Sequence, residues 1–365
     1  MFLRSAFVRT AIVVCASAAA AFSANTVGLQ AGKAALRSAG PLAFGPNGIL
    51  FIGDSLGASI VAIDTGDTKA AKNAEPIEIK ELNLKIAAAL GTTADQILIN
   101  DVIVNPVSKK VYISVSRGRG PEATPVILRT DASGKLTEVS MDNVKFARVS
   151  LPNAPDENAK DQRGANRRLE SITDLGFVDG KVIVAGLSNE EFSSTLRVIP
   201  YPFAAVDKGA GIEIFHGAHG RFETNAPVRT FVNYDIAGKQ HILAAYTCTP
   251  LVRIPVSELK PGAKVKGTTI AELGNRNRPL DMITYKKDGG QFILMANSSR
   301  GVMKLPAEKL ESYEGITAQT EKKGVPYETI ATLKGVQQLD KLDEGHALLL
   351  TDASGTLDLH TIALP

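Results

Sequence analysis

A histidine pair and one cysteine carry the most specific chemistry in this chain. His216 and His219 are separated by two residues, and Cys248 follows the next strongly apolar segment. Imidazole nitrogens and a thiolate together suit Cu(I), Cu(II) or Zn(II). Glu170, or alternatively Asp174, is expected to complete the ligand set from the adjacent blade. The residues therefore predict a copper or zinc site formed by His216, His219, Cys248 and Glu170.

Two other interpretations of Cys248 stay open. A lone cysteine in a protein core usually behaves as a small hydrophobic residue. Alternatively, Cys248 and His219 would form a nucleophilic or redox pair, which requires a thiol of lowered pKa. The other cysteine, Cys15, lies in an N-terminal apolar segment that we expect to be removed, so no intramolecular disulfide is predicted.

Arginine-rich loops and recurrent acidic residues predict a second site. Arginine presents a fixed fork of N–H donors that suits carboxylate or phosphate groups. We therefore expect a small anionic molecule or peptide to bind at this site. The predicted ligand-binding residues are Arg168, Arg221, Arg276, Arg278, Asp101, Asp174, Asp281 and Asn297. The alternative is structural: the arginines form ion pairs with nearby acidic residues, and each aspartate accepts N–H bonds from its own turn.

An internal repeat indicates which elements position these residues. A short apolar strand, a tight turn and a strongly apolar strand recur six times, at a spacing of about 59 residues. The copies occupy residues 41–55, 101–116, 172–188, 233–247, 280–298 and 339–353. A third strand follows each copy, and several copies have a fourth, including residues 76–82 in the first. The repeat predicts an all-β fold, a six-bladed β-propeller with four-stranded blades; the alternative is a pair of β-sandwiches or a two-domain all-β protein. Helix is expected only at Leu82–Leu90 and around Pro306–Tyr313.

The two ends of the repeat array predict how the ring closes. The last copy has three strands and no fourth, whereas residues 34–38 precede the first copy. We expect that N-terminal segment to complete the last blade, because closure removes the exposed sheet edges. In such a ring, the first strands begin and the second strands end on one face. The predicted metal and ligand residues would meet on that face.

The segments AGPLAFGPNGILFIGDS (39–55) and NRPLDMITYKKDGGQFILMANSS (277–299) resemble six-bladed propellers of the NHL-repeat and gluconolactonase/regucalcin-like proteins. The resemblance implies the fold. Gluconolactonase-like enzymes bind one divalent cation through a glutamate, two asparagines and an aspartate, so the resemblance also implies a cation site. Asp281 and Asn297 match two of these ligands, whereas Ala39 stands at the glutamate position.

Composition limits the location and the partners. Arg4, Arg9 and the apolar residues 11–22 are typical of a secretory signal peptide, with cleavage expected after Ser23. The mature chain, residues 24–365, is then one propeller domain in the periplasm or outside the cell. A formal charge of +3 with no basic block argues against nucleic acid. No apolar run reaches the length of a membrane span.

Three classes of function remain after these observations. The first is a secreted propeller that binds a small anionic ligand or peptide at the top of its channel, with the Cys/His metal site. The second is a metal-dependent, lactonase-like hydrolase, and the third is a protein-interaction scaffold. The sequence contains no G-x-S-x-G, HExxH or P-loop motif, so no catalytic residues are predicted.

Overall fold

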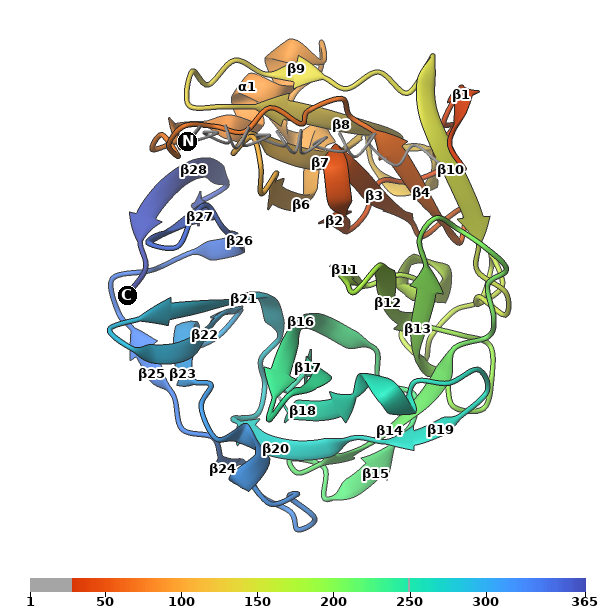
Figure 1. Cartoon of the computed structure of the whole chain (residues 1–365), viewed down its shortest axis with the longest axis vertical. Helices are drawn as coiled ribbons and strands as arrows, with labels where there is room; N and C mark the ends of the chain where they lie inside the picture. Colours follow the sequence, from red (N-terminus) through yellow and green to blue (C-terminus); the bar gives the residue numbers. More distant parts are fainter. Residues whose placement is uncertain (1–27, 249) are drawn as a thin grey trace, which may run out of the picture.

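Six antiparallel sheets surround a central channel in the computed structural model, which describes residues 28–248 and 250–365 (Figure 1). The predicted all-β, six-bladed propeller is confirmed, but its blades have four to six strands and not four throughout. We number the blades by the order in which their innermost strands occur in the chain. The predicted signal peptide, its cleavage site and Cys15 lie outside the described residues.

The strands of the first three blades run as follows, from the innermost outward. Blade 1 contains β2 (Leu42–Phe44), β3 (Ile49–Asp54), β4 (Ser59–Asp64), β10 (Val144–Ser150) and β1 (Gln30–Gly32). Blade 2 contains β6 (Ile97–Val104), β7 (Val111–Arg117), β8 (Thr124–Thr130) and β9 (Thr137–Glu138). Blade 3 contains β11 (Asp174–Val178), β12 (Lys181–Leu187), β13 (Ser194–Pro200), β14 (Ala210–His216) and β15 (Arg221–Glu223), with β19 (Lys264–Lys266) parallel to β14.

The other three blades follow the same plan. Blade 4 contains β16 (Val228–Ile236), β17 (Lys239–Tyr246), β18 (Pro250–Pro255), β20 (Thr268–Leu273) and β24 (Lys322–Gly324). Blade 5 contains β21 (Pro279–Lys287), β22 (Gly290–Asn297), β23 (Gly301–Pro306) and β25 (Glu328–Ile330). Blade 6 contains β26 (Val336–Lys341), β27 (His346–Ala353), β28 (Thr356–Ala363) and β5 (Glu78–Ile79).

The apolar second strands form the core of the disc. In β3 every residue is buried, and β12 and β17 are buried along almost their whole length. Such strands read as continuous apolar runs because both faces of each blade pack against neighbouring blades. Burying one large aliphatic side chain stabilises the fold by about 1.5–3 kcal/mol. The short helix α1 (Leu82–Ala89) confirms the helix expected there, and only a 3-10 turn at Leu310–Ser312 forms near the second expected helix.

The ring closes, but through a different strand from the predicted one. Segment 76–82 was expected to complete blade 1, and residues 34–38 to complete the last blade. Instead β5 pairs with β28 and completes blade 6. The fourth strand of blade 1 is β10, which comes after blade 2 in the chain. Both exchanges join segments far apart in the sequence, so the local strand pattern contains no signal for them.

The blades do not follow one another in chain order. The inner strand β6 of blade 2 lies between β2 and β26, and β11 of blade 3 lies next to β2 (Figure 1). The order around the ring is therefore 1, 2, 6, 5, 4, 3. The chain leaves blade 1, adds β5 to blade 6, builds blade 2 and returns through β10 to blade 1.

Four channel aspartates connect neighbouring blades. One carboxylate oxygen of each accepts an N–H from the inner strand of the next blade, at 2.6–2.9 Å. These bonds join Asp174 to Phe231, Asp281 to Leu339, Asp340 to Val104 and Asp101 to Leu42. The other oxygen accepts the N–H of the following residue. The channel aspartates thus stabilise the ring as well as their own strands.

Candidate functional site

The predicted histidines and cysteine meet between blades 3 and 4. His216 ends β14, His219 lies in the hairpin loop before β15, and Cys248 lies in the turn after β17. Their ligand atoms all lie within 4.8 Å of one another. His216 is buried, Cys248 is partly buried and His219 is exposed. We call these three residues the metal cluster.

Backbone geometry explains why the two segments meet. Gly217 donates its N–H to Glu272 Oε1 at 2.5 Å, and a Cβ at this position would lie 2.6 Å from the Glu272 side chain. Only glycine therefore lets the hairpin approach β20 this closely. On the other side, Cys248 adopts a φ of 63° and donates its N–H to the Asn277 carbonyl at 2.8 Å.

Glu223 orients both imidazole rings. Its carboxylate contacts Nδ1 of His216 at 2.8 Å and Nδ1 of His219 at 2.7 Å, and Arg221 donates to it at 3.1 Å. Because a carboxylate only accepts, each Nδ1–H donates to Glu223, and Nε2 is the nitrogen left for a metal. Although burial alone raises the pKa of Glu223, the hydrogen bonds from His216 and His219 lower it to about 2.

The Nε2 atom of His216 is buried and lacks, among the described residues, the hydrogen-bond partner that a buried polar atom requires. A carboxylate on one imidazole nitrogen with a free second nitrogen is the usual arrangement of a metal-ligating histidine. The donor set therefore fits a transition metal bound by two Nε2 atoms and one thiolate. Glu223 was not predicted, although its spacing from His219 on one hairpin is a detectable signal.

Two further glutamates lie near this region. Glu170 was predicted as a ligand, but it is not part of the metal cluster. Its carboxylate accepts a 2.6 Å bond from Arg229, which also donates to Thr247, the neighbour of Cys248. Glu272 is buried with one carboxylate oxygen unpartnered among the described residues, and burial raises its pKa to about 7.

Inside the channel, three predicted acidic residues converge. Asp101, Asp174 and Asp281 line a constriction of about 70 Å³ together with Thr230 and Gln338. Burial raises the pKa of Asp101 and of Asp174 to about 7. Burial, and then the neighbouring Asp101, also raises the pKa of Asp281. With its amide nitrogen directed at them, Gln338 donates to Asp101 at 3.2 Å and to Asp281 at 3.1 Å.

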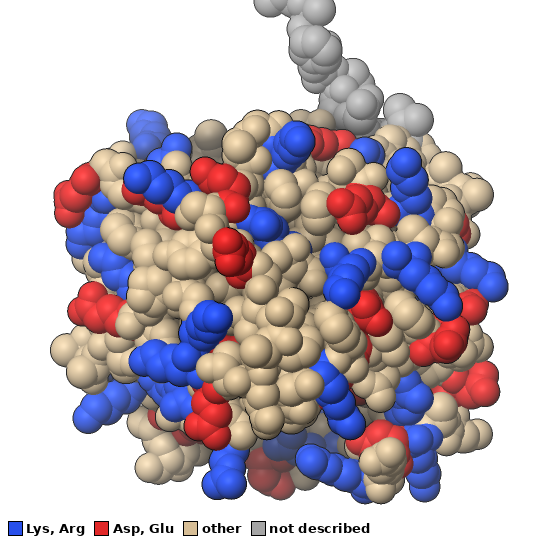
Figure 2. Space-filling model, turned by 90° about the horizontal axis from the view of Figure 1, so that it is seen from below, with Lys and Arg blue, Asp and Glu red and all other residues tan. Residues whose placement is uncertain are grey.

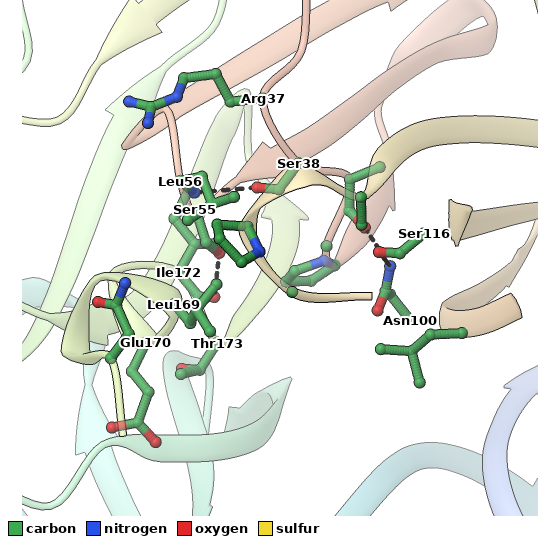
Figure 3. Close-up of a pocket in the computed structure, with 18 of the residues that line it drawn as sticks. Arg37, Ser38, Ser55, Leu56, Asn100, Ser116, Leu169, Glu170, Ile172 and Thr173 are labelled. Atoms are coloured by element: carbon green, nitrogen blue, oxygen red, sulfur yellow. Dashed lines mark hydrogen bonds between the residues drawn. The ribbon is translucent and has the colours of Figure 1, made fainter. Parts of the chain in front are cut away.

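Above the constriction lies a larger hollow, the mouth cavity, of about 580 Å³ (Figure 3). Blade 1 contributes Ser38 and Leu56 on one side, and blade 2 contributes Asn100 and Ser116 opposite them. The 3-10 turn Arg167–Glu170 and the start of blade 3 form a third wall. Pro41, Asn100, Thr173 and Arg229 line both the mouth cavity and the constriction, so the two spaces adjoin.

The predicted arginines separate into two groups. Arg278 lines the mouth cavity, as do Arg37, Arg119 and Arg229. Arg168, Arg221 and Arg276 do not line it. Arg168 donates to the Leu56 and Pro155 carbonyls, Arg221 donates to Glu223, and Arg276 is exposed with a φ of 58°.

Asn297 has a structural position. It is buried, and its side-chain oxygen accepts the N–H groups of Ser299 and Arg300 in the turn after β22. Its amide donates to Asn277 at 3.3 Å. These bonds hold the turn beside the Cys248 loop, because Asn277 also receives the Cys248 N–H through its carbonyl.

The outer surface shows no concentration of one charge on the side drawn in Figure 2, where basic and acidic side chains alternate. Nucleic-acid-binding proteins concentrate Lys and Arg along one face. This side of the disc lacks that feature. No helix within the described ranges is long and apolar enough to cross a membrane.

Comparisons with known proteins identify only distant structural likenesses. No family model matches the chain, and no curated protein matches it. A putative oxidoreductase (glucose dehydrogenase) from Thermus thermophilus is 12% identical over 92% of this chain and 100% of its own, with a TM-score of 0.33. The PQQ-bound aldose sugar dehydrogenase of Streptomyces coelicolor is 13% identical over 91% of this chain and 97% of its own, with a TM-score of 0.34. A Bacteroides ovatus glycosyl hydrolase is 8% identical over 81% of this chain and 93% of its own, with a TM-score of 0.38.

Proposed function

We propose that this protein is an exported metal-binding β-propeller that holds copper or zinc through His216, His219 and Cys248. The observation that supports this most directly is the position of the three ligand atoms within 4.8 Å of one another. The unpartnered, buried Nε2 of His216 supports it independently. A bound transition metal would act there as a Lewis acid or, for copper, as a redox centre.

The chain's own residues prepare the cluster for a metal. Glu223 holds both imidazoles in one tautomer, and Gly217 allows the hairpin to approach Glu272. Metal binding requires the Cys248 thiol to lose its proton, so binding should release protons and weaken at acid pH. Export depends on the predicted signal peptide, and N-terminal sequencing of the mature protein tests cleavage after Ser23.

Metal analysis of protein purified without chelators tests this proposal. We expect one Cu or Zn per chain, lost in Cys248→Ser and in His219→Ala. His346→Ala is the matched control, because His346 is an exposed histidine that contacts Asp343 far from the cluster in sequence. Metal-free native protein whose thiol reacts only after denaturation would overturn the proposal.

A second function is favoured by the mouth cavity, which would bind a small anionic molecule or peptide. Among the residues that the structure describes, four arginines and a single carboxylate, that of Glu170, line it. Calorimetric titration with citrate and inorganic phosphate tests anion binding, and Arg278→Gln should weaken it. Lactone turnover that is lost with a chelator would instead favour the hydrolase alternative, and capture of a folded partner protein would favour the scaffold.

A further inference from the structure

The mouth cavity has an apolar wall that an anion alone would not use. Among the described residues, five large apolar side chains are exposed, and two of them line this cavity. They are Leu98 of blade 2, with 48% of its surface exposed, and Leu169 of the Arg167–Glu170 turn, with 54% exposed. Leu56 and Pro121 extend the same apolar surface. Exposed apolar side chains gathered in one concave site are typical of ligand contacts.

Two of the four lining arginines, Arg229 and Arg278, reach the cavity from blades 4 and 5, whereas Arg37 and Arg119 belong to blades 1 and 2. The blade order places blade 4 opposite blade 2 and blade 5 opposite blade 1 (Figure 1). Arg229, at the start of β16, therefore faces the side of Leu98, and Arg278, just before β21, faces the side of blade 1. A ligand in the cavity would touch both kinds of wall.

The arginines differ in how far their charge is already paired. Arg229 is paired with Glu170 at 2.6 Å, and Arg37 with Glu157 at 2.5 Å. Arg119 donates to the backbone carbonyls of Asp95 and Ile97. The Arg278 guanidinium has no hydrogen bond or ion pair with any described residue, although its backbone N–H donates to Ser298. Arg278 is therefore the guanidinium that is open to an anionic group.

The floor of the cavity limits where an anion can lie. The constriction below it offers about 70 Å³ and is lined by the carboxyl groups of Asp101, Asp174 and Asp281. Their carboxylate oxygens already accept backbone N–H groups, and a space of about 70 Å³ is too small for a carboxylate with an apolar body. Such a ligand therefore stays in the mouth cavity, against the apolar wall.

From these contacts we infer that the mouth cavity binds a small monocarboxylate with an apolar body. The carboxylate pairs with Arg278, and the alkyl or aryl body packs against Leu169 and Leu98. A volume of about 580 Å³ lies within the range of pockets that hold one small organic molecule. This inference rests on the anion-binding function proposed above and adds the chemical class of the ligand.

Calorimetric titration of the mature protein with four probes tests the inference. Octanoate should bind at least tenfold more tightly than acetate, which lacks the body, and than octanol, which lacks the charge. Citrate, a polar polyanion, should also bind more weakly than octanoate. Arg278→Gln should weaken octanoate binding at least tenfold, and Leu169→Ser should weaken octanoate without changing acetate.

The matched control is Arg276→Asn. Arg276 lies two residues from Arg278, does not line the cavity, and has a φ of 58° that asparagine tolerates. Its substitution should leave octanoate binding unchanged. Equal binding of octanol and octanoate, or no effect of Arg278→Gln, would overturn the inference. If citrate or phosphate binds through Arg278 but octanoate does not, the anion-binding function stands and the apolar body is excluded. If no anion binds, both are overturned.

Discussion

The channel constriction and the metal cluster both gather titratable side chains, but the fold uses the two groups differently. In the constriction, each carboxylate oxygen of Asp101, Asp174 and Asp281 already accepts a backbone N–H or an amide proton. In the metal cluster, one nitrogen of each imidazole is held by Glu223, and the Nε2 of His216 has no partner among the described residues.

The difference shows how a structural cluster is distinguished from a binding site. A buried polar atom without a partner costs free energy, and when it is a metal-binding atom beside two other such atoms, a bound ion offsets that cost. The channel aspartates meet this requirement for a partner internally, and the metal cluster does not.

Removal of a channel aspartate should have the largest effect. In Asp281→Ala the N–H groups of Met282 and Leu339 lose their acceptor, which should lower the free energy of unfolding by about 2–4 kcal/mol. Asp281→Asn keeps one of the two acceptor oxygens and should cost about half as much. Urea denaturation of both variants measures the difference. Two equally stable variants would show that these bonds do not hold the ring together.

Glu223→Gln should produce the next largest effect, on metal affinity rather than on folding. An amide offers one acceptor oxygen and directs its nitrogen at the second Nδ1–H, so one imidazole loses its orientation. We expect the dissociation constant for copper or zinc to rise about 10–100-fold. Competition with a chromophoric chelator measures this change.

Glu190→Gln is the control for that experiment, because Glu190 is exposed and pairs with Lys208 away from the cluster. Affinities that are the same for Glu223→Gln and the native protein would mean that the carboxylate does not position the ligands.

The raised pKa of Asp174 should give the channel a measurable pH dependence. Its folded pKa is about 7, above the ordinary value near 3.9, so between these values the folded chain holds a proton that the unfolded chain releases. The contribution of this bound proton to the free energy of unfolding is complete below about pH 4 and is lost as pH rises through 7. Between pH 5 and 6 this loss amounts to about 1.4 kcal/mol per pH unit. In Asp174→Asn the free energy of unfolding should therefore fall less steeply with pH, by that amount. Parallel stability curves for the two proteins would contradict the raised pKa.

The smallest effect is expected for Cys248→Ala in metal-free protein. Cys248 is only partly buried, and alanine keeps the same strained φ, so the free energy of unfolding should change by less than about 1 kcal/mol. Thermal denaturation after chelator treatment measures it. A larger loss would support the interpretation of Cys248 as a core residue.

The sequence predicted the parts of the fold that depend on local pattern. Second strands such as β3 and β17 can be recognised in the sequence, because strands buried on both faces are apolar along their length. The helix α1 was predicted for the same local reason. His216 and His219 come together because one hairpin joins them, and Cys248 was expected near them from its place after a second strand.

Only the tertiary structure decided the order of the blades and the partners of the charged groups. Whether β5 completes blade 1 or blade 6 depends on which sheet edge it meets, and a two-residue strand has no side-chain pattern that specifies this. Glu170 and Glu223 are the same residue type, and both have arginines nearby in the sequence. Packing places Arg229 beside Glu170 and both histidines beside Glu223. The hydrophobic pattern determines that six sheets form, because each apolar strand, its turn and the next strand are contiguous in the chain. The site depends on which blades become neighbours, because its residues come from different blades.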